Sequence, residues 1–273
     1  MPTLNNTHIE IIHPSIQRGQ VHSVLFDFDG TLSLIREGWQ GVMVPMMVEI
    51  LQALGTGETE SELTALVTEF VDRLTGKQTI YQMIELSAQV TDRGGQALDP
   101  LTYKRRYLDR LWERIEHRVI GLREGTLTPA EMVVPGAFDI LEALRRRGLT
   151  CYLASGTDQP YVFDEADALG ISPYFAGGIF GALDEYERFS KAQVIQDILR
   201  THHLQGSQLL AFGDGFVEIE ETKRVGGIAV GVASDEARRQ GIDDWKRDRL
   251  IQAGADIIIP DFREQDVLLD YLL

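Results

Sequence analysis

The fold is decided by the stretch Val24-Leu25-Phe26-Asp27-Phe28-Asp29-Gly30-Thr31-Leu32. An apolar, β-favouring run ends there at an Asp-Gly pair, as a buried strand that ends in a turn should. Residues two apart on a strand point to the same side, so Asp27 and Asp29 would face one site if the chain is still extended there. Two carboxylates that close need a cation or a shared proton to relieve their repulsion. A strand closed by an Asp-Gly turn would account for Asp29 and Gly30, but not for Asp27.

Further apolar runs recur along the chain outward from this stretch. Segments with a helical pattern separate these runs, for example Ala137–Arg147 and Lys191–His202. This alternation predicts an α/β fold, a doubly wound parallel sheet with helices on both faces. The runs expected to form its other strands are Leu149–Ala154, Tyr174–Phe180, Leu209–Phe212, Ile228–Val232 and Ile257–Ile259.

Residues 34–128 interrupt this alternation. Their sequence is typical of successive helices and contains no convincing strand. In the first helical segment, Val44, Met47, Val48, Leu51 and Leu54 recur at spacings of three and four, which marks one apolar face. We therefore predict an inserted all-α domain over 34–128, between core segments 21–33 and 129–273, with 1–20 as an N-terminal extension. Its expected helices are Gln40–Leu54, Ser61–Thr75, Ile80–Thr91 and Leu101–Arg118.

Composition excludes several classes of protein. The 26 Lys and Arg against 42 Asp and Glu give a formal charge of −16, which would repel a nucleic-acid backbone. Cys151 is the only cysteine, so neither an intrachain disulfide nor a thiolate metal cluster can form. Residues 1–20 do not resemble a signal peptide, and no segment approaches the roughly 18 apolar residues of a membrane helix. We expect a cytoplasmic protein with no membrane partner, and the oligomeric state stays open.

Three more polar groups follow apolar strands or open helices. Ser155 and Gly156 end the run at Ala154 with a hydroxyl and backbone N–H groups that can hold phosphate oxygens. Lys191 begins a helix and can act as a mobile point charge, although Arg188 competes for that role. Asp214 and Glu218 follow another strand and offer hard oxygen ligands, which suit Mg²⁺.

With these groups in order along the chain, the stretch from Asp27 to Thr31 resembles the first motif of the haloacid dehalogenase-like hydrolase superfamily. That family also has a strand ending in Ser or Thr, then a Lys, then an acidic motif, and Ser155, Lys191 and Asp214 match these in sequence order. The resemblance implies a Rossmann-like core with a helical cap inserted between the first and second motifs. It therefore agrees with the all-α insert over 34–128 that the periodicity of apolar residues predicts.

The resemblance also implies a Mg²⁺-dependent phosphatase acting on a small phosphorylated metabolite. Asp27 would attack phosphorus to form an aspartyl-phosphate, and Asp29 would protonate the departing alcohol and later deprotonate water. The implied Mg²⁺ ligands are Asp27, the Asp29 backbone carbonyl, Asp214 and Glu218. Glu218 departs from the family pattern, which usually has Asp there. The implied phosphate-binding residues are Thr31, Ser155, Gly156 and Lys191.

The residues of the first motif also exclude some other activities found in this superfamily. Asp29 argues against a dehalogenase, which lacks this carboxylate, and against a phosphonate-cleaving relative, which would have Ala there. A sugar-phosphate mutase keeps both carboxylates and is the nearest alternative; a catalytically silent binding or regulatory module is the second. Motifs of P-loop, dinucleotide-binding and serine-hydrolase enzymes are absent. Substrate choice is expected to involve the insert and its neighbourhood, with Arg36, Trp39, Tyr81 and Tyr103 as candidates.

Overall fold

The computed structural model describes residues 3–273, which form two compact units. An α/β unit contains the chain up to Glu37 and again Arg118–Leu273, and a helical unit contains Gly38–His117. The chain therefore leaves the α/β unit shortly after the first motif and returns to it before the second.

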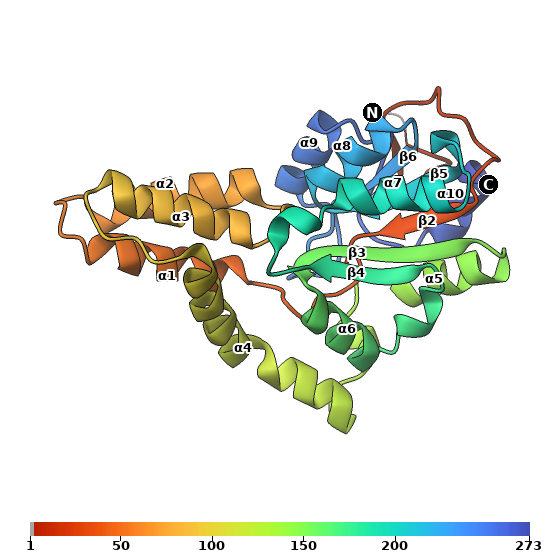
Figure 1. Cartoon of the computed structure of the whole chain (residues 1–273). Helices are drawn as coiled ribbons and strands as arrows, with labels where there is room; N and C mark the ends of the chain where they lie inside the picture. The colour runs from red at the N-terminus through yellow and green to blue at the C-terminus, as the bar shows by residue number, and fades with distance from the viewer. Residues whose placement is uncertain (1–2) are drawn as a thin grey trace. The chain divides into compact units, whose positions relative to one another are not determined.

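A seven-stranded sheet forms the centre of the α/β unit (Figure 1), in the order β1-β7-β6-β5-β2-β3-β4. Every neighbouring pair is parallel except β1 and β7. The predicted doubly wound α/β class is therefore confirmed. The strands are β1 (Glu10–Ile11), β2 (Ser23–Phe26), β3 (Thr150–Asp158), β4 (Gly178–Ala182), β5 (Leu209–Gly213), β6 (Ile228–Val232) and β7 (Ile257–Ile259).

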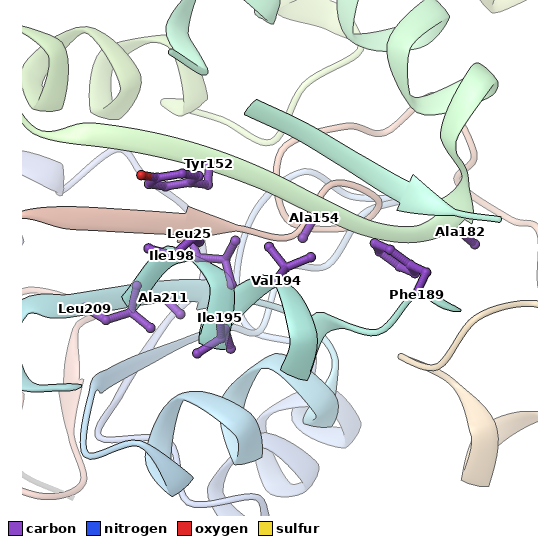
Figure 2. Close-up of a cluster of buried hydrophobic side chains, with 10 residues drawn as sticks. All are labelled: Leu25, Tyr152, Ala154, Ala182, Phe189, Val194, Ile195, Ile198, Leu209 and Ala211. Atoms are coloured by element: carbon purple, nitrogen blue, oxygen red, sulfur yellow. The ribbon is translucent and has the colours of Figure 1, made fainter. Parts of the chain in front are cut away.

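Both faces of the sheet are buried: consecutive residues of β2, β5 and β6 are all buried, although they point to opposite sides. Leu25 and its register partner Ala211 lie in a cluster with Val194, Ile195 and Ile198 of α7, as Figure 2 shows. The helices of this unit are α5 (Ala137–Arg146), α6 (Gln159–Ala168), α7 (Lys191–Thr201), α8 (Phe216–Arg224), α9 (Asp244–Gln252) and α10 (Gln265–Leu272). In Figure 1, α5 and α6 lie on one side of the sheet and α7 and α8 on the other.

An aromatic cluster fills the opposite face. The ring of Phe26 stacks on that of Phe212 with centroids 4.9 Å apart, and Phe175 and Phe262 meet it edge-on. All four side chains are buried. The apolar packing holds the central strands in place. The polar residues come after the carboxyl ends of these strands.

The central strand β2 lies between β3 and β5, and the register aligns their ends. Phe26 pairs with Leu153 on one side and with Phe212 on the other. The residues that follow leave the sheet at the carboxyl-terminal ends of these strands. Here the direction in which successive strands are added changes, since β3 lies on one side of β2 and β5 on the other. Ligands of open α/β sheets bind at such a switch point.

The helical unit consists of α1 (Gln40–Gln52), α2 (Glu60–Leu74), α3 (Ile80–Asp92) and most of α4 (Pro100–Glu124). A capping box between Thr59 and Glu62 starts α2. Helix α4 is longer than the predicted Leu101–Arg118, and its last turns belong to the α/β unit. There, Arg118 donates to the main-chain oxygens of Ile35 (2.8 Å) and Glu37 (3.1 Å), so that the two connecting segments are fastened together.

Short 3₁₀ turns complete the elements. They are Pro129–Glu131, Ser172–Tyr174, Tyr186–Arg188 and Gly206–Gln208. The strand expected over Tyr174–Phe180 was therefore placed too early, because a 3₁₀ turn precedes β4. Within residues 3–273, no helix combines the length and the apolar character needed to cross a membrane.

Candidate active site

Three carboxylates meet at the carboxyl ends of β2 and β5. Asp27 follows β2, Asp214 follows β5, and Glu218 lies in the first turn of α8. One oxygen from each lies within 4.8 Å of the other two. Hard oxygen donors at this separation fit a Mg²⁺ ion, which carboxylates bind together with water and substrate phosphates.

Lys191, the first residue of α7, lies between two of these acids. Its Nζ is 2.9 Å from Asp27 Oδ1 and 2.7 Å from Glu218 Oε2, and the side chain is buried. Burial would lower the pKa of Lys191, but the two carboxylates outweigh burial and raise it, so the amine stays charged. Arg188, its competitor in the sequence, is exposed and pairs with Glu185. The structure thus brings Lys191 and not Arg188 to Asp27.

Asp27 is a buried carboxylate with a perturbed titration. Burial raises its pKa well above the ordinary value, Lys191 opposes that shift, and Glu218 and Asp214 add to it. Its Oδ1 also accepts a hydrogen bond from the backbone N of Phe28 (2.8 Å). A carboxylate in these surroundings needs positive charge nearby to remain ionised, and Lys191 or a metal ion can supply it.

Glu218 folds back over the start of its own helix. Its Oε1 accepts a hydrogen bond from the backbone N of Gly215 (2.7 Å), and burial raises its pKa against the opposing effect of Lys191. A Cβ on Gly213 would lie 2.0 Å from Glu218 Oε1, so only glycine leaves room for this carboxylate. The longer side chain of Glu thus reaches the site from the position where the family usually has Asp.

Asp29 is held by two hydroxyls from the end of β3. Its Oδ2 accepts from Ser155 Oγ (3.2 Å) and from Thr157 Oγ1 (2.8 Å). Its Oδ1 is buried without a hydrogen-bond partner among residues 3–273, and Arg36 Nε is 3.9 Å away. Thr157 was missed in the sequence, although it follows Ser155 by two residues on one strand and so shares its side.

The turn after Asp29 carries the other predicted first-motif residues. Gly30 has φ +73°, and a Cβ there would lie 2.2 Å from Asp214 Oδ2. Ser234 Oγ donates to the Gly30 carbonyl oxygen at 2.7 Å, which fixes the turn from the loop after β6. Thr31 is buried, and its hydroxyl has no hydrogen-bond partner in the described part of the chain. Gly156, also predicted to bind phosphate, is half-buried between Ser155 and Thr157.

A second lysine reaches the site from α9 and was not predicted. Lys246 Nζ is 2.9 Å from Asp214 Oδ2 and 2.6 Å from Glu236 Oε1. Burial raises the pKa of Glu236, with Lys246 opposing and Asp214 adding to the shift. Burial would lower the pKa of Lys246, but Asp214 and Glu236 raise it overall. The sequence did offer a signal for Glu236, which comes shortly after β6, as Asp214 comes directly after the neighbouring strand β5.

Arg36, one of the expected substrate contacts, makes a buried ion pair. Its guanidinium binds Glu165 with Nε at 3.0 and 3.1 Å and Nη2 at 2.6 Å from the carboxylate oxygens, and both side chains are buried. Tyr161 lies 5.4 Å from the guanidinium carbon, measured to the ring centroid. The other three candidates, Trp39, Tyr81 and Tyr103, are in the helical unit.

Comparison with known proteins supplies a family and a fold. A family model described as haloacid dehalogenase-like hydrolase matches residues 21–226. A search of curated proteins by sequence found no match. A structure described as a predicted phosphoglycolate phosphatase from Haemophilus somnus 129PT is 17% identical, with a TM-score of 0.58 over 91% of this chain and 98% of its own.

Two further structures of low sequence identity share the fold. A β-phosphoglucomutase from Clostridium difficile is 13% identical, with a TM-score of 0.60 over 92% of this chain and 97% of its own. A hydrolase of the same family from Deinococcus radiodurans R1, solved with bound phosphate and sodium, is 16% identical, with a TM-score of 0.55 over 93% and 98%. At these identities the likeness concerns the fold alone.

Proposed function

The chain belongs to the haloacid dehalogenase-like hydrolase family, and we propose that it is a Mg²⁺-dependent phosphatase that hydrolyses a small phosphomonoester through an aspartyl-phosphate on Asp27. The observation that carries the proposal is the contact of 2.9 Å between buried Asp27 and Lys191, beside Asp214 and Glu218 at neighbouring strand ends. A nucleophilic carboxylate, a fixed cation and metal-ligating acids are what phosphoryl transfer requires.

Asp27 and Asp29 divide the covalent chemistry between them. An oxygen of Asp27 forms a bond to phosphorus as the ester bond breaks, and protonated Asp29 gives its proton to the departing alcohol. Asp29 then takes a proton from water, which attacks phosphorus and releases inorganic phosphate and free Asp27. The Thr157 hydroxyl holds the Asp29 carboxyl in place for both steps. The Ser155 hydroxyl, whose contact with Asp29 is longer at 3.2 Å, turns to the phosphate when substrate binds.

Lys191 and the main chain bind the phosphate. The amine counters the charge of Asp27 and of the phosphoryl oxygens, so that two anions can approach each other. Ser155, Gly156 and Thr31 complete the proposed phosphate site. The buried Thr31 hydroxyl has no hydrogen-bond partner among residues 3–273, so it is available to a phosphate oxygen. When bound by Asp27, the Asp29 main-chain carbonyl, Asp214 and Glu218, Mg²⁺ would neutralise phosphate charge.

The proposed substrate is a small phosphorylated metabolite. The formal charge of −16 opposes binding of a polyanion, whereas a single phosphate group needs only the local positive charge of the site. We propose that the helical unit acts as the cap and selects the substrate. The residues to test are Trp39, Tyr81 and Tyr103 in that unit and Arg36 shortly before it.

The test is phosphate release from a panel of small phosphomonoesters, with Mg²⁺ and with a chelator. Wild type should release phosphate only with Mg²⁺, and Asp27→Asn should abolish release. Asp197→Asn is the matched control, because Asp197 is exposed on α7 and pairs only with a surface arginine among the described contacts. Release that survives Asp27→Asn would displace Asp27 as the nucleophile.

A sugar-phosphate mutase remains the second candidate, because Asp27 and Asp29 together can serve phosphoryl transfer to a sugar hydroxyl as well as to water. Incubation with a sugar phosphate separates the two. A hydrolase gives inorganic phosphate and free sugar, and a mutase gives an isomeric sugar phosphate. No turnover of any ester would favour a silent module, although Asp27, Asp29, Ser155, Lys191 and Asp214 are all in place.

A further inference from the structure

Two lysines in the site are each bound between two carboxylates. Lys191 joins Asp27 and Glu218, at 2.9 and 2.7 Å. Lys246 joins Asp214 and Glu236, at 2.9 and 2.6 Å. The second group has no place in the proposed mechanism, yet it contains Asp214, one of the proposed metal ligands.

Glu236 lies next to Asp214, one of the proposed metal ligands, because the same Lys246 Nζ contacts an oxygen of each carboxylate. A Cβ on Gly30 would lie 2.2 Å from Asp214 Oδ2 and 3.0 Å from Glu236 Oε1. Both carboxylates therefore approach the turn that directly follows Asp29. The Glu236 oxygen at that turn is the same atom that Lys246 contacts.

Lys246 is fixed in this position. It lies in the first turn of α9, where its backbone N donates to the N-cap side chain of Asp243 at 3.0 Å. The residue is 9% exposed, so the amine cannot swing into solvent without opening the site. The ion pair with Glu236 is thus part of the folded site and not a surface contact.

The two lysine-centred groups together carry a net negative charge that a divalent cation can offset. They contain four carboxylates, of Asp27, Glu218, Asp214 and Glu236, and two amines, of Lys191 and Lys246. Loss of Lys246 would leave three negative charges and a fourth carboxylate without a partner. More negative charge favours tighter binding of either cation, whereas more available oxygens favour Ca²⁺ in particular, because Ca²⁺ takes more ligands.

The two cations differ in the ligands they need. Mg²⁺ is usually held by one or two carboxylates with several waters and substrate phosphates, whereas Ca²⁺ takes about six to eight oxygens in flexible geometry. We propose that Lys246 withholds Glu236 from the metal and so keeps the site selective for Mg²⁺ over Ca²⁺. This inference rests on the metal site of the proposed function.

Calorimetric titration of substrate-free protein with Mg²⁺ and with Ca²⁺ tests the inference without relying on activity. Lys246→Met should lower the Ca²⁺ dissociation constant by about tenfold more than that of Mg²⁺, because a carboxylate has been added to the ligand set. Lys246→Met with Glu236→Gln should restore the wild-type ratio. Lys223→Met is the matched control, since Lys223 makes a comparable 2.8 Å ion pair with Asp256 outside the site.

Other outcomes overturn the inference. Equal changes in both constants would mean that Lys246 contributes only charge, and weaker binding of both cations would mean that it positions Asp214. If Lys246→Met does not fold, Lys246→Gln is titrated in its place and judged by the same ratio of dissociation constants. A loss of Ca²⁺ affinity in Glu236→Gln that exceeds the loss of Mg²⁺ affinity would show that Glu236 already ligates the cation, and would overturn the inference. Selective binding without turnover of any phosphate ester would leave the inference standing and remove the proposed function.

Discussion

Replacement of Arg36 by methionine should lower the free energy of unfolding by up to about 3–4 kcal/mol near pH 7. Arg36 is 7% exposed and Glu165 2%, and their two side chains meet through Nε at 3.0 Å and Nη2 at 2.6 Å. Methionine fills much of the volume of the arginine stem but removes the charge. The variant therefore leaves the Glu165 carboxylate buried and without its counter-ion.

The size of this loss in unfolding free energy is set by the cost of neutralising the buried, unpaired Glu165 carboxylate. Burial already raises the pKa of Glu165, and the nearby charge of Arg36 opposes that shift. Without Arg36 the carboxyl takes up a proton on folding. At about pH 7, protonation of a group with an ordinary pKa of about 4.3 costs about 1.4 kcal/mol for each of nearly three pH units. This value lies within the range of about 3–5 kcal/mol observed for broken buried ion pairs.

The same reasoning gives a pH dependence with a definite sign. In the variant, the pKa of Glu165 is higher in the folded state than in the unfolded state, so the folded state binds the proton more tightly. The difference in free energy of unfolding between wild type and Arg36→Met should therefore shrink as pH falls toward about 4.3, by up to about 1.4 kcal/mol per pH unit. It should grow again as pH rises.

Urea unfolding at several pH values measures the effect, with coincident fluorescence and circular-dichroism transitions as the check of two-state behaviour. Arg200→Met is the control, because its pair with Asp197 is exposed and should cost within about 1 kcal/mol. Adding Glu165→Met to Arg36→Met should recover most of the loss. A loss below about 1 kcal/mol, or one that is independent of pH, would refute the reasoning.

Three further predictions concern single sites. Gly30→Ala should abolish the rise in melting temperature caused by Mg²⁺, because its Cβ would lie 2.2 Å from Asp214 Oδ2; Gly148→Ala, with φ +74° and no atom within 4 Å, should retain that rise. Thr157→Val removes a donor 2.8 Å from the proposed general acid and should lower kcat by about tenfold with little change in KM. Burial raises the pKa of Cys151 to about 12, so its thiol should resist Ellman's reagent below that pH in the folded protein and react once urea unfolds it.

Local signals in the sequence were sufficient for the sheet and for much of the site. The runs Ile228–Val232 and Ile257–Ile259 are strands with the predicted bounds, because buried parallel strands are short, continuous and apolar. Asp27 and Asp214 follow such strands, and adjacent parallel strands bring their ends together whatever the intervening sequence. The strand-end rule therefore placed these residues in one neighbourhood without any knowledge of their contacts.

Contacts that depend on packing between distant segments could not be predicted in this way. Lys246 reaches Asp214 from a helix, and its local sequence is that of an ordinary charged surface helix. Glu165 likewise looks like a solvent-exposed helix residue until the fold brings Arg36 to it. The short strand β1 pairs antiparallel with β7 at the sheet edge, and two residues carry too little pattern to be recognised.

Trapping of the covalent intermediate tests the central claim most directly. Enzyme mixed with a turned-over phosphomonoester and Mg²⁺ is quenched in acid and treated with borohydride, which reduces an acyl phosphate to an alcohol, and the modified residue is located by tandem mass spectrometry. We predict conversion of Asp27 to homoserine in wild type, and none in Asp27→Asn or without substrate. Reduction at another carboxylate, or steady phosphate release with no trapped residue under rapid quenching, would contradict the assignment of Asp27 as the nucleophile.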